Sequence, residues 1–141
     1  MRLASVFCSI ILLLTLSACD DTESKDSPKA NLLLDILDIS FSVKDGRQVF
    51  SHTRVFRETN GIDLMITRGK ICVESKKTCV DAFVEYEVEA YGKLTQNNHH
   101  VATRQGEDEI TFEYWAKDDN GHEHKISKTL IVDGEKAAVK H

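Results

Sequence analysis

Asp81-Ala-Phe-Val-Glu-Tyr-Glu-Val-Glu-Ala90 is the stretch of this sequence that indicates the fold most directly. Every second residue from Ala82 to Ala90 is apolar, and acidic residues occupy most of the positions between them. A period of two places alternate side chains on opposite faces of an extended chain, so the stretch predicts a strand with one buried face. The apolar face consists of Ala82, Val84, Tyr86, Val88 and Ala90, and the acidic face carries Asp81, Glu85, Glu87 and Glu89.

Similar alternation recurs on both sides of this strand and sets the fold class. Turn signals follow one another every 8–12 residues or so, and no long helical pattern is present. The chain therefore predicts an all-β fold, a single antiparallel β-sandwich of about seven or eight short strands over residues 32–133. Further strands are expected at residues 37–43, 49–58, 62–67, 71–73, 78–80, 101–104, 110–116 and 126–132.

The connections are predicted from their turn residues. Asn60-Gly61 is typical of a type I′ hairpin and predicts that residues 55–59 pair with residues 62–67. Lys93 to His100 is expected to be a polar loop, and residues 134–141 a loose tail. Residues 28–36 are open between a short helix starting at Pro28 and a strand, of which we favour the strand.

The motif Tyr114-x-Ala116-x-Asp118-x-Asn120-Gly121, set between two alternating strands, resembles the last hairpin of bacterial immunoglobulin-like, PKD-like and cadherin-like domains. The resemblance covers about residues 80–132 and implies an immunoglobulin-like sandwich. The chain departs from the antibody pattern, because it has no cysteine pair at inter-sheet spacing and its lone Trp115 is out of phase with the core positions. Trp115 is either an exposed binding anchor or partly buried under a loop.

Leu16-Ser17-Ala18-Cys19 resembles the lipobox of bacterial lipoproteins, in which the cysteine becomes the lipidated first residue. An uncharged run from Leu3 to Ala18 precedes it, and this run is shorter than the roughly 18–20 residues that a spanning helix needs. We therefore expect a signal peptide at residues 1–18 and, at residues 19–31, the lipidated Cys19 followed by a flexible tether. In such lipoproteins, the acidic Asp20 and Asp21 imply retention in the inner membrane, facing the periplasm, or in the outer membrane where the sorting rule differs.

Charge excludes one class of partner. Removing the signal also removes Arg2, which leaves 17 Lys and Arg against 23 Asp and Glu, a net charge of −6. Nucleic-acid binding needs a basic face, so this partner is not expected. The membrane is expected to be reached through the N-terminal lipid, and no small-molecule substrate is expected.

The remaining cysteines predict a disulfide. Cys8 lies in the signal and Cys19 is the lipidation site, so only Cys72 and Cys79 stay as a pair, in a compartment where disulfides persist. A turn at residues 74–77 places them directly opposite each other in an antiparallel ladder. A pair that stays reduced is the alternative.

Metal and catalytic motifs are weak. His122-x-His124 places two imidazoles on one strand face, which with a third group is a metal-binding spacing, but adjacent solvated histidines are commoner. The carboxylates of Glu85, Glu87 and Glu89 lie along a line, whereas calcium needs oxygens that converge. The sequence contains no Gly-x-Ser-x-Gly, phosphate loop or His-Glu-x-x-His. We therefore expect no metal, no cofactor and no catalytic residues.

Recognition of another envelope protein is the function that these patterns favour, as in exclusion, immunity and inhibitor proteins, the first of which block an incoming conjugation apparatus. A structural accessory of a secretion or conjugation machine is the alternative. Hairpin tips of sandwiches commonly bind partners. The expected partner-binding surface joins the last hairpin and a neighbouring loop, and comprises Trp115, Asp119, Asn120, His122, His124, Asn97, Asn98, His99 and His100.

Overall fold

The computed structural model describes residues 27–141. The expected signal peptide, the expected lipobox with Cys19, and Asp20 and Asp21 lie outside the described residues. No helix among residues 27–141 is long and apolar enough to cross a membrane. The described chain consists of strands β1 (Leu32–Lys44), β2 (Arg47–Glu58), β3 (Leu64–Val73), β4 (Thr78–Val88), β5 (Lys93–Thr103), β6 (Glu107–Asp118), β7 (Glu123–Asp133) and β8 (Lys136–Val139).

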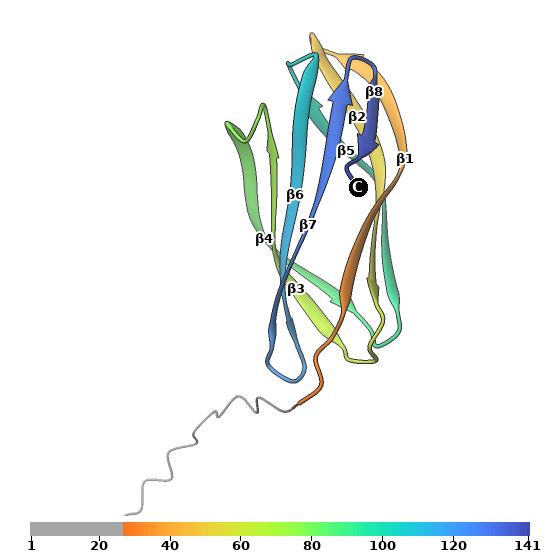
Figure 1. Ribbon diagram of the computed structural model, residues 1–141, viewed down its shortest axis with the longest axis vertical. Helices are drawn as coiled ribbons and strands as arrows, with labels where there is room; N and C mark the ends of the chain where they lie inside the picture. Colours follow the sequence, from red (N-terminus) through yellow and green to blue (C-terminus); the bar gives the residue numbers. More distant parts are fainter. Residues whose placement is uncertain (1–26) are drawn as a thin grey trace, which may run out of the picture.

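Two antiparallel sheets form the domain (Figure 1). One has three strands in the order β1-β2-β5, and the other has five in the order β4-β3-β6-β7-β8. The chain therefore crosses between sheets after β2, β4 and β5, as in the Greek-key connections of immunoglobulin-like sandwiches. The predicted all-β antiparallel sandwich is confirmed.

The core lies between the sheets and follows from alternation on the central strands. Alternate residues of β6, from Ile110 to Ala116, are buried, and so are Phe50 and Phe56 of β2. The ring of Phe56 meets the ring of Tyr114 edge-on, with centroids 4.9 Å apart. Burial of each such aromatic side chain contributes about 1.5–3 kcal/mol, so these two strands supply much of the hydrophobic stabilisation.

Asn60-Gly61 does not form the predicted hairpin. β2 pairs with β1 and β5, whereas β3 pairs with β4 and β6, so Asn60-Gly61 carries the chain from one sheet to the other. Gly61 has the expected positive φ of 80°, but Asn60 does not, so the type I′ turn is not formed either. The apolar faces of the flanking strands pack across the core instead of side by side, and this packing overrides the local hairpin preference.

Two segments expected to be irregular are strands. The predicted polar loop at residues 93–100 is most of β5, which tolerates polar side chains because it is an edge strand with one face in solvent. The predicted tail at residues 134–141 contains β8, which returns through a turn at Gly134 (φ 58°) and pairs with β7. The open segment 28–36 is strand from Leu32 onward.

Cys72 and Cys79 form a disulfide, as predicted. The two residues are register partners in the β3–β4 hairpin, and their Cα atoms are 4.1 Å apart. The hairpin extends beyond the three-stranded sheet (Figure 1), and its turn is held by the buried carboxylate of Asp108, which accepts backbone N–H groups of Glu74 and Ser75. Closing a loop of this length lowers the conformational entropy of the unfolded chain, which stabilises the fold by about 2–2.5 kcal/mol.

A buried cation lies between the sheets. Arg54 of β2 is 5% exposed and donates to the hydroxyl of Tyr114 and to the ring of His99. His52 lies two residues away on the same face, with its ring edge-on to Phe112. Burial, together with the charge of Arg54, lowers the pKa of both His52 and His99, so both imidazoles stay neutral beside the guanidinium.

These histidines predict a loss of stability in mild acid. An unfolded histidine titrates near pH 6.5, so below that pH the unfolded chain binds more protons than the folded one and the free energy of unfolding falls. We expect the urea midpoint to be lower at about pH 5.5 than at about pH 7.5, a window above the titration of the carboxylates.

His99→Gln keeps an acceptor for Arg54 without a titrating group, and this variant is expected to lose part of the pH dependence. His141→Gln, which changes an exposed histidine at the C-terminus, is the matched control and keeps all of it. Equal midpoints for the wild-type protein at the two pH values contradict the assignment.

Candidate functional site

Trp115 lies on the outer face of the five-stranded sheet. Its neighbours Tyr114 and Ala116 point into the core, so alternation along β6 turns the indole away from it. The indole stacks between two cations, with the Arg68 guanidinium carbon 4.5 Å and the Lys125 Nζ 4.9 Å from the ring centroid. The sequence prediction that Trp115 is out of phase with the core is confirmed, and strand neighbours rather than a loop cover part of it.

One cross-strand row contains this stack. Phe83 of β4 pairs with Arg68 of β3, Arg68 pairs with Trp115 of β6, and Trp115 pairs with Lys125 of β7. Neighbouring strands lie about 4.8 Å apart, so the row spans roughly 14 Å across the sheet. We call these four side chains the outer-face row.

Carboxylates on the same face fix the two cations. Asp81 accepts from Nε and Nη2 of Arg68 at 2.8 and 2.5 Å, and Glu113 lies 2.6 Å from Nζ of Lys125. The hydrogen bond from Arg68 lowers the pKa of Asp81, and that from Lys125 lowers the pKa of Glu113. Each pair stays charged at neutral pH, so the cations remain ordered against the indole.

Phe83 ends the row at an edge of the sheet. Its side chain is 92% exposed, although it stands within an ordered strand. Within the described chain β4 pairs only with β3, so its other edge has no strand beside it. An exposed aromatic ring, an ordered tryptophan and an arginine are the side chains that dominate protein–protein interfaces.

Asn120 and His122, which were also expected to bind a partner, instead hold the chain that leads into β1. Residues 27–31, which we call the strap, lie against the β6–β7 hairpin at the lower end of the domain (Figure 1). Nδ2 of Asn120 donates to the carbonyl of Pro28 at 2.7 Å, and Nε2 of the buried His122 lies 2.9 Å from Oγ of Ser27. Residues 27–31 were expected to be part of a flexible tether, because they offer no large apolar side chain to bury. They are bound to the domain instead, mainly through hydrogen bonds of their backbone groups.

Asp118 is the centre of this arrangement. Its Oδ2 accepts the N–H of Ala30 at 3.0 Å and lies 2.8 Å from Nε2 of His124, while its Oδ1 accepts the N–H groups of Asn120 and His122. Burial raises the pKa of Asp118, but these donors outweigh it and the pKa is lowered. The carboxylate therefore ties the hairpin to the strap as an anion.

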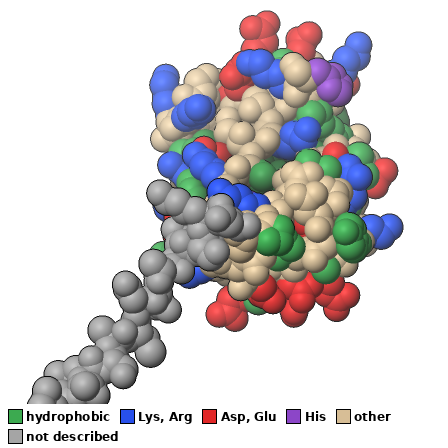
Figure 2. Space-filling model, turned by 60° about the horizontal axis from the view of Figure 1, so that its bottom comes forward, with side chains coloured by type: hydrophobic (Ala, Val, Ile, Leu, Met, Phe, Trp, Pro, Cys, Tyr) green, Lys and Arg blue, Asp and Glu red, His purple; other side chains and the backbone are tan. Residues whose placement is uncertain are grey.

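Asp119, also predicted to bind a partner, stands apart from this cluster. Asp119 is exposed, and its backbone N–H bonds to the carbonyl of Asp63. Figure 2 views this end of the domain, where acidic and basic side chains mix on the surface and acidic ones gather along one margin. The turn of the hairpin, Asp119-Asn120-Gly121, carries no apolar side chain that could anchor a partner. The hairpin instead holds the strap through Asp118, Asn120 and His122, which we call the clamp.

The predicted neighbouring loop is not next to the hairpin. Residues 97–100 lie in the middle of β5, in the other sheet, where a bulge with Asn98 at a φ of 59° interrupts the ladder. His99 turns inward to Arg54 and His100 turns outward, while Asn97 accepts from the hydroxyl of Thr53 at 3.5 Å. The expected surface is therefore divided among the outer-face row, the clamp and β5.

The histidine and glutamate motifs do not converge. Among residues 27–141, no three His, Cys, Asp or Glu side chains form a group that suits a metal ion. His124 is paired with Asp118, and His122 with the strap. Both imidazoles therefore take part in holding the chain together.

Sequence reasoning missed most of the outer-face row. Phe83 carried a signal, because it is a large aromatic residue on the otherwise acidic face of an alternating strand. Arg68 and Lys125 carried none, since their approach to Trp115 depends on strand pairing and on a bulge at Thr67. Nothing in the sequence indicated that the carboxylates of Glu58, Asp108 and Asp118 are buried.

The clamp predicts a specific effect of neutralising Asp118. Asp118→Asn places an amide NH₂ where N–H donors converge, so we expect a loss of about 1–3 kcal/mol in stability. Amide hydrogen exchange is expected to accelerate at Ala30 more than at core residues such as Phe112.

Asp119→Asn is the matched control, because it makes the same chemical change one residue away on an exposed side chain. It is expected to leave both stability and exchange unchanged. If Asp118→Asn leaves the exchange of Ala30 unaltered while the domain stays folded, the clamp does not hold the strap.

Comparisons with known proteins address the fold alone. No protein-family model matches the chain, and no curated protein matches it. A crystal structure of a Bordetella pertussis protein that carries the name ApaA aligns with 76% of this chain and 96% of its own, at a TM-score of 0.58 and 11% identity. The Northeast Structural Genomics Consortium target SoR45 aligns with 74% of this chain and 85% of its own, at a TM-score of 0.55 and 9% identity. The chain thus shares its β-sandwich architecture with solved proteins of very different sequence.

Proposed function

We propose that this protein is a lipid-anchored envelope protein that acts by binding another envelope protein, without catalysis, through the outer-face row. The observation that carries the proposal is Phe83, a phenylalanine 92% exposed on an ordered edge strand. Its burial against a partner contributes about 1.5–3 kcal/mol through removal of apolar surface from water. Among residues 27–141, no strand lies beside this edge of β4 to cover the ring.

The rest of the row supports the same role. Trp115 is ordered by Arg68 and Lys125 before any partner arrives, so little side-chain freedom remains to be lost on binding. The flanking carboxylates keep the face charged around its aromatic centre, which resembles the polar rim of protein interfaces. The row thus has the composition of an interface hot spot, with aromatic rings and an arginine at its centre.

The proposed anchor places this face near a membrane. The lipobox at residues 16–19 supports lipidation of Cys19, and Asp20 with Asp21 supports retention in the inner membrane with the domain in the periplasm. Because the strap is bonded to the domain, only residues 20–26 separate it from the lipid. Seven residues span at most about 25 Å, so the domain works close to the bilayer.

Within this role we favour exclusion, immunity or inhibition, in which a small lipoprotein blocks an incoming conjugation apparatus, a toxin or a wall-cleaving enzyme. A single hot spot on a small tethered domain suits a factor that meets its challenger at the membrane. A structural subunit is expected instead to remain within a large assembly on purification.

Photocrosslinking in intact cells tests the proposal. A photoactivatable phenylalanine analogue at position 83 is expected to capture one envelope protein, and Phe83→Ser is expected to weaken binding of that protein by about tenfold or more. The stability of Phe83→Ser should change by no more than about 0.5 kcal/mol, because the side chain is exposed.

Tyr91 provides the matched control, since it is an aromatic residue 77% exposed at the strap end of the domain. The analogue at position 91 is expected not to trap the protein captured from position 83. Equal capture from both positions, or no capture from position 83 in cells that meet the challenger, rejects the outer-face row as the binding surface.

Density-gradient fractionation tests the location. The protein is expected to sediment with inner-membrane markers, and Asp20→Ser is expected to move it to the outer membrane. Cys19→Ser removes the lipidation site and should release the chain from lipid anchoring. Recovery of the unaltered protein with the outer membrane contradicts the assignment.

A further inference from the structure

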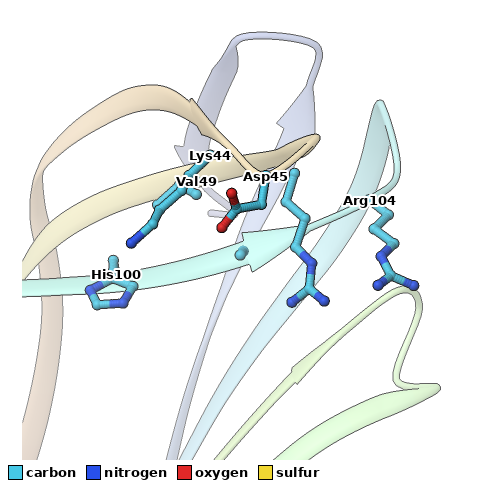
Figure 3. Close-up of a pocket in the computed structure, with 7 residues that line it drawn as sticks. Lys44, Asp45, Val49, His100 and Arg104 are labelled. Atoms are coloured by element: carbon cyan, nitrogen blue, oxygen red, sulfur yellow. The ribbon is translucent and has the colours of Figure 1, made fainter.

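A basic groove lies at the end of the domain opposite the strap, on the outer face of the three-stranded sheet. It has a volume of about 340 Å³ and is lined by Lys44, Asp45, Arg47, Val49, His100, Ala102 and Arg104. Figure 3 shows Lys44 and His100 at one side of the groove and Arg104 at the other. The lining residues come from the β1–β2 turn, β2 and the end of β5.

The arginines of this groove differ from the others in the described chain. Arg57 and Arg68 each bond to an aspartate, and Arg54 is buried between the sheets. Arg47 and Arg104 are both exposed, and neither forms an ion pair with any carboxylate of residues 27–141. A guanidinium presents a planar fork of donors that suits a carboxylate, so two unpaired arginines in one groove are ready for an acidic ligand.

Charge is segregated at this place. The groove holds three permanent cations, Lys44, Arg47 and Arg104, against the single carboxylate of Asp45. The chain as a whole has the opposite balance, with 23 acidic against 18 basic residues. Such a local reversal of sign attracts an acidic partner and orients its approach.

The floor of the groove is apolar, and this adds a preference for a ligand with small apolar groups. Val49 and Ala102 are register partners, so their small apolar side chains lie side by side on the outer face. A compact ion makes no use of such a floor. An extended segment that alternates carboxylates with small apolar residues meets both the cations and the floor.

We propose that this groove binds an acidic, extended peptide segment of a partner protein. Carboxylates of the segment bond to Arg47 and Arg104, and a small side chain between them rests on Val49 and Ala102. The headgroups of the membrane that holds the anchor are a poor alternative, because the groove lies at the end farthest from the strap (Figure 1). The groove is separate from the outer-face row, so it is a second contact, and only the exclusion of the membrane rests on the anchor proposed above.

The test uses a short peptide in which glutamate alternates with alanine, and a matched peptide with glutamine in place of glutamate. In amide NMR titrations of the folded domain, the glutamate peptide is expected to shift resonances of residues 44–49 and 100–104. Binding should weaken by about tenfold or more as salt is raised from low to high concentration, since screening acts on exposed charges. The glutamine peptide is expected not to bind.

Arg47→Glu with Arg104→Glu is expected to abolish these shifts, whereas the control Lys77→Glu with Lys117→Glu makes the same change in net charge elsewhere and should retain them. Equal binding of both peptides, equal loss in both double variants, or tighter binding of inorganic pyrophosphate than of the peptide overturns the proposal. Amide spectra that are unchanged away from the substituted positions show that each variant is folded.

Discussion

The buried carboxylate of Glu58 is the interaction on which the rest of the sandwich depends. It accepts backbone N–H groups from three separate segments: Asn31 in the strap, Asn60, Gly61 and Ile62 in the β2–β3 crossover, and Tyr91 in the β4–β5 crossover. Buried N–H groups without an acceptor are costly, and these crossovers have no ladder to supply one. Burial raises the pKa of Glu58, but the converging donors outweigh it and lower the pKa to about 2. One anion thus joins the two sheets at the end where two of the three crossings, β2–β3 and β4–β5, lie.

Asp118 extends the same principle to the strap. Together with Glu58 it binds consecutive backbone N–H groups, those of Ala30 and Asn31, so the chain leading into β1 is held from both sheets. This arrangement gives the domain a fixed attachment to the segment that precedes it. The proposed consequence is functional, because a strap fixed to the domain limits the orientations in which the outer-face row and the basic groove meet partners.

Strand alternation and the cysteine spacing predicted the sandwich and the disulfide, because both depend on neighbours in the sequence. The pairing of β2 was predicted wrongly from Asn60-Gly61, since turn residues report local backbone conformation and not the sheet to which the next strand belongs. Residues 93–100 of β5 were taken for a loop because an edge strand tolerates polar residues on its outer face. Trp115 was placed correctly out of the core, but its neighbours were not, since the approach of Phe83, Arg68 and Lys125 is created by cross-strand register and a bulge. Of the histidines near Trp115 in sequence, His122 contacts the strap and His124 pairs with Asp118.

The central structural claim is that Glu58 is a buried anion satisfied by backbone donors from the strap and from the β2–β3 and β4–β5 crossovers. The most direct test is a carbon-13 NMR titration of its side-chain carboxyl in the folded domain. The structure predicts a midpoint near pH 2, with the stability contributed by this group complete above its ordinary pKa of 4.5 and lost as the pH falls toward about 2. A midpoint at or above 4.5 would show that the donors do not converge on Glu58, and would contradict this account of how the two sheets and the strap are joined.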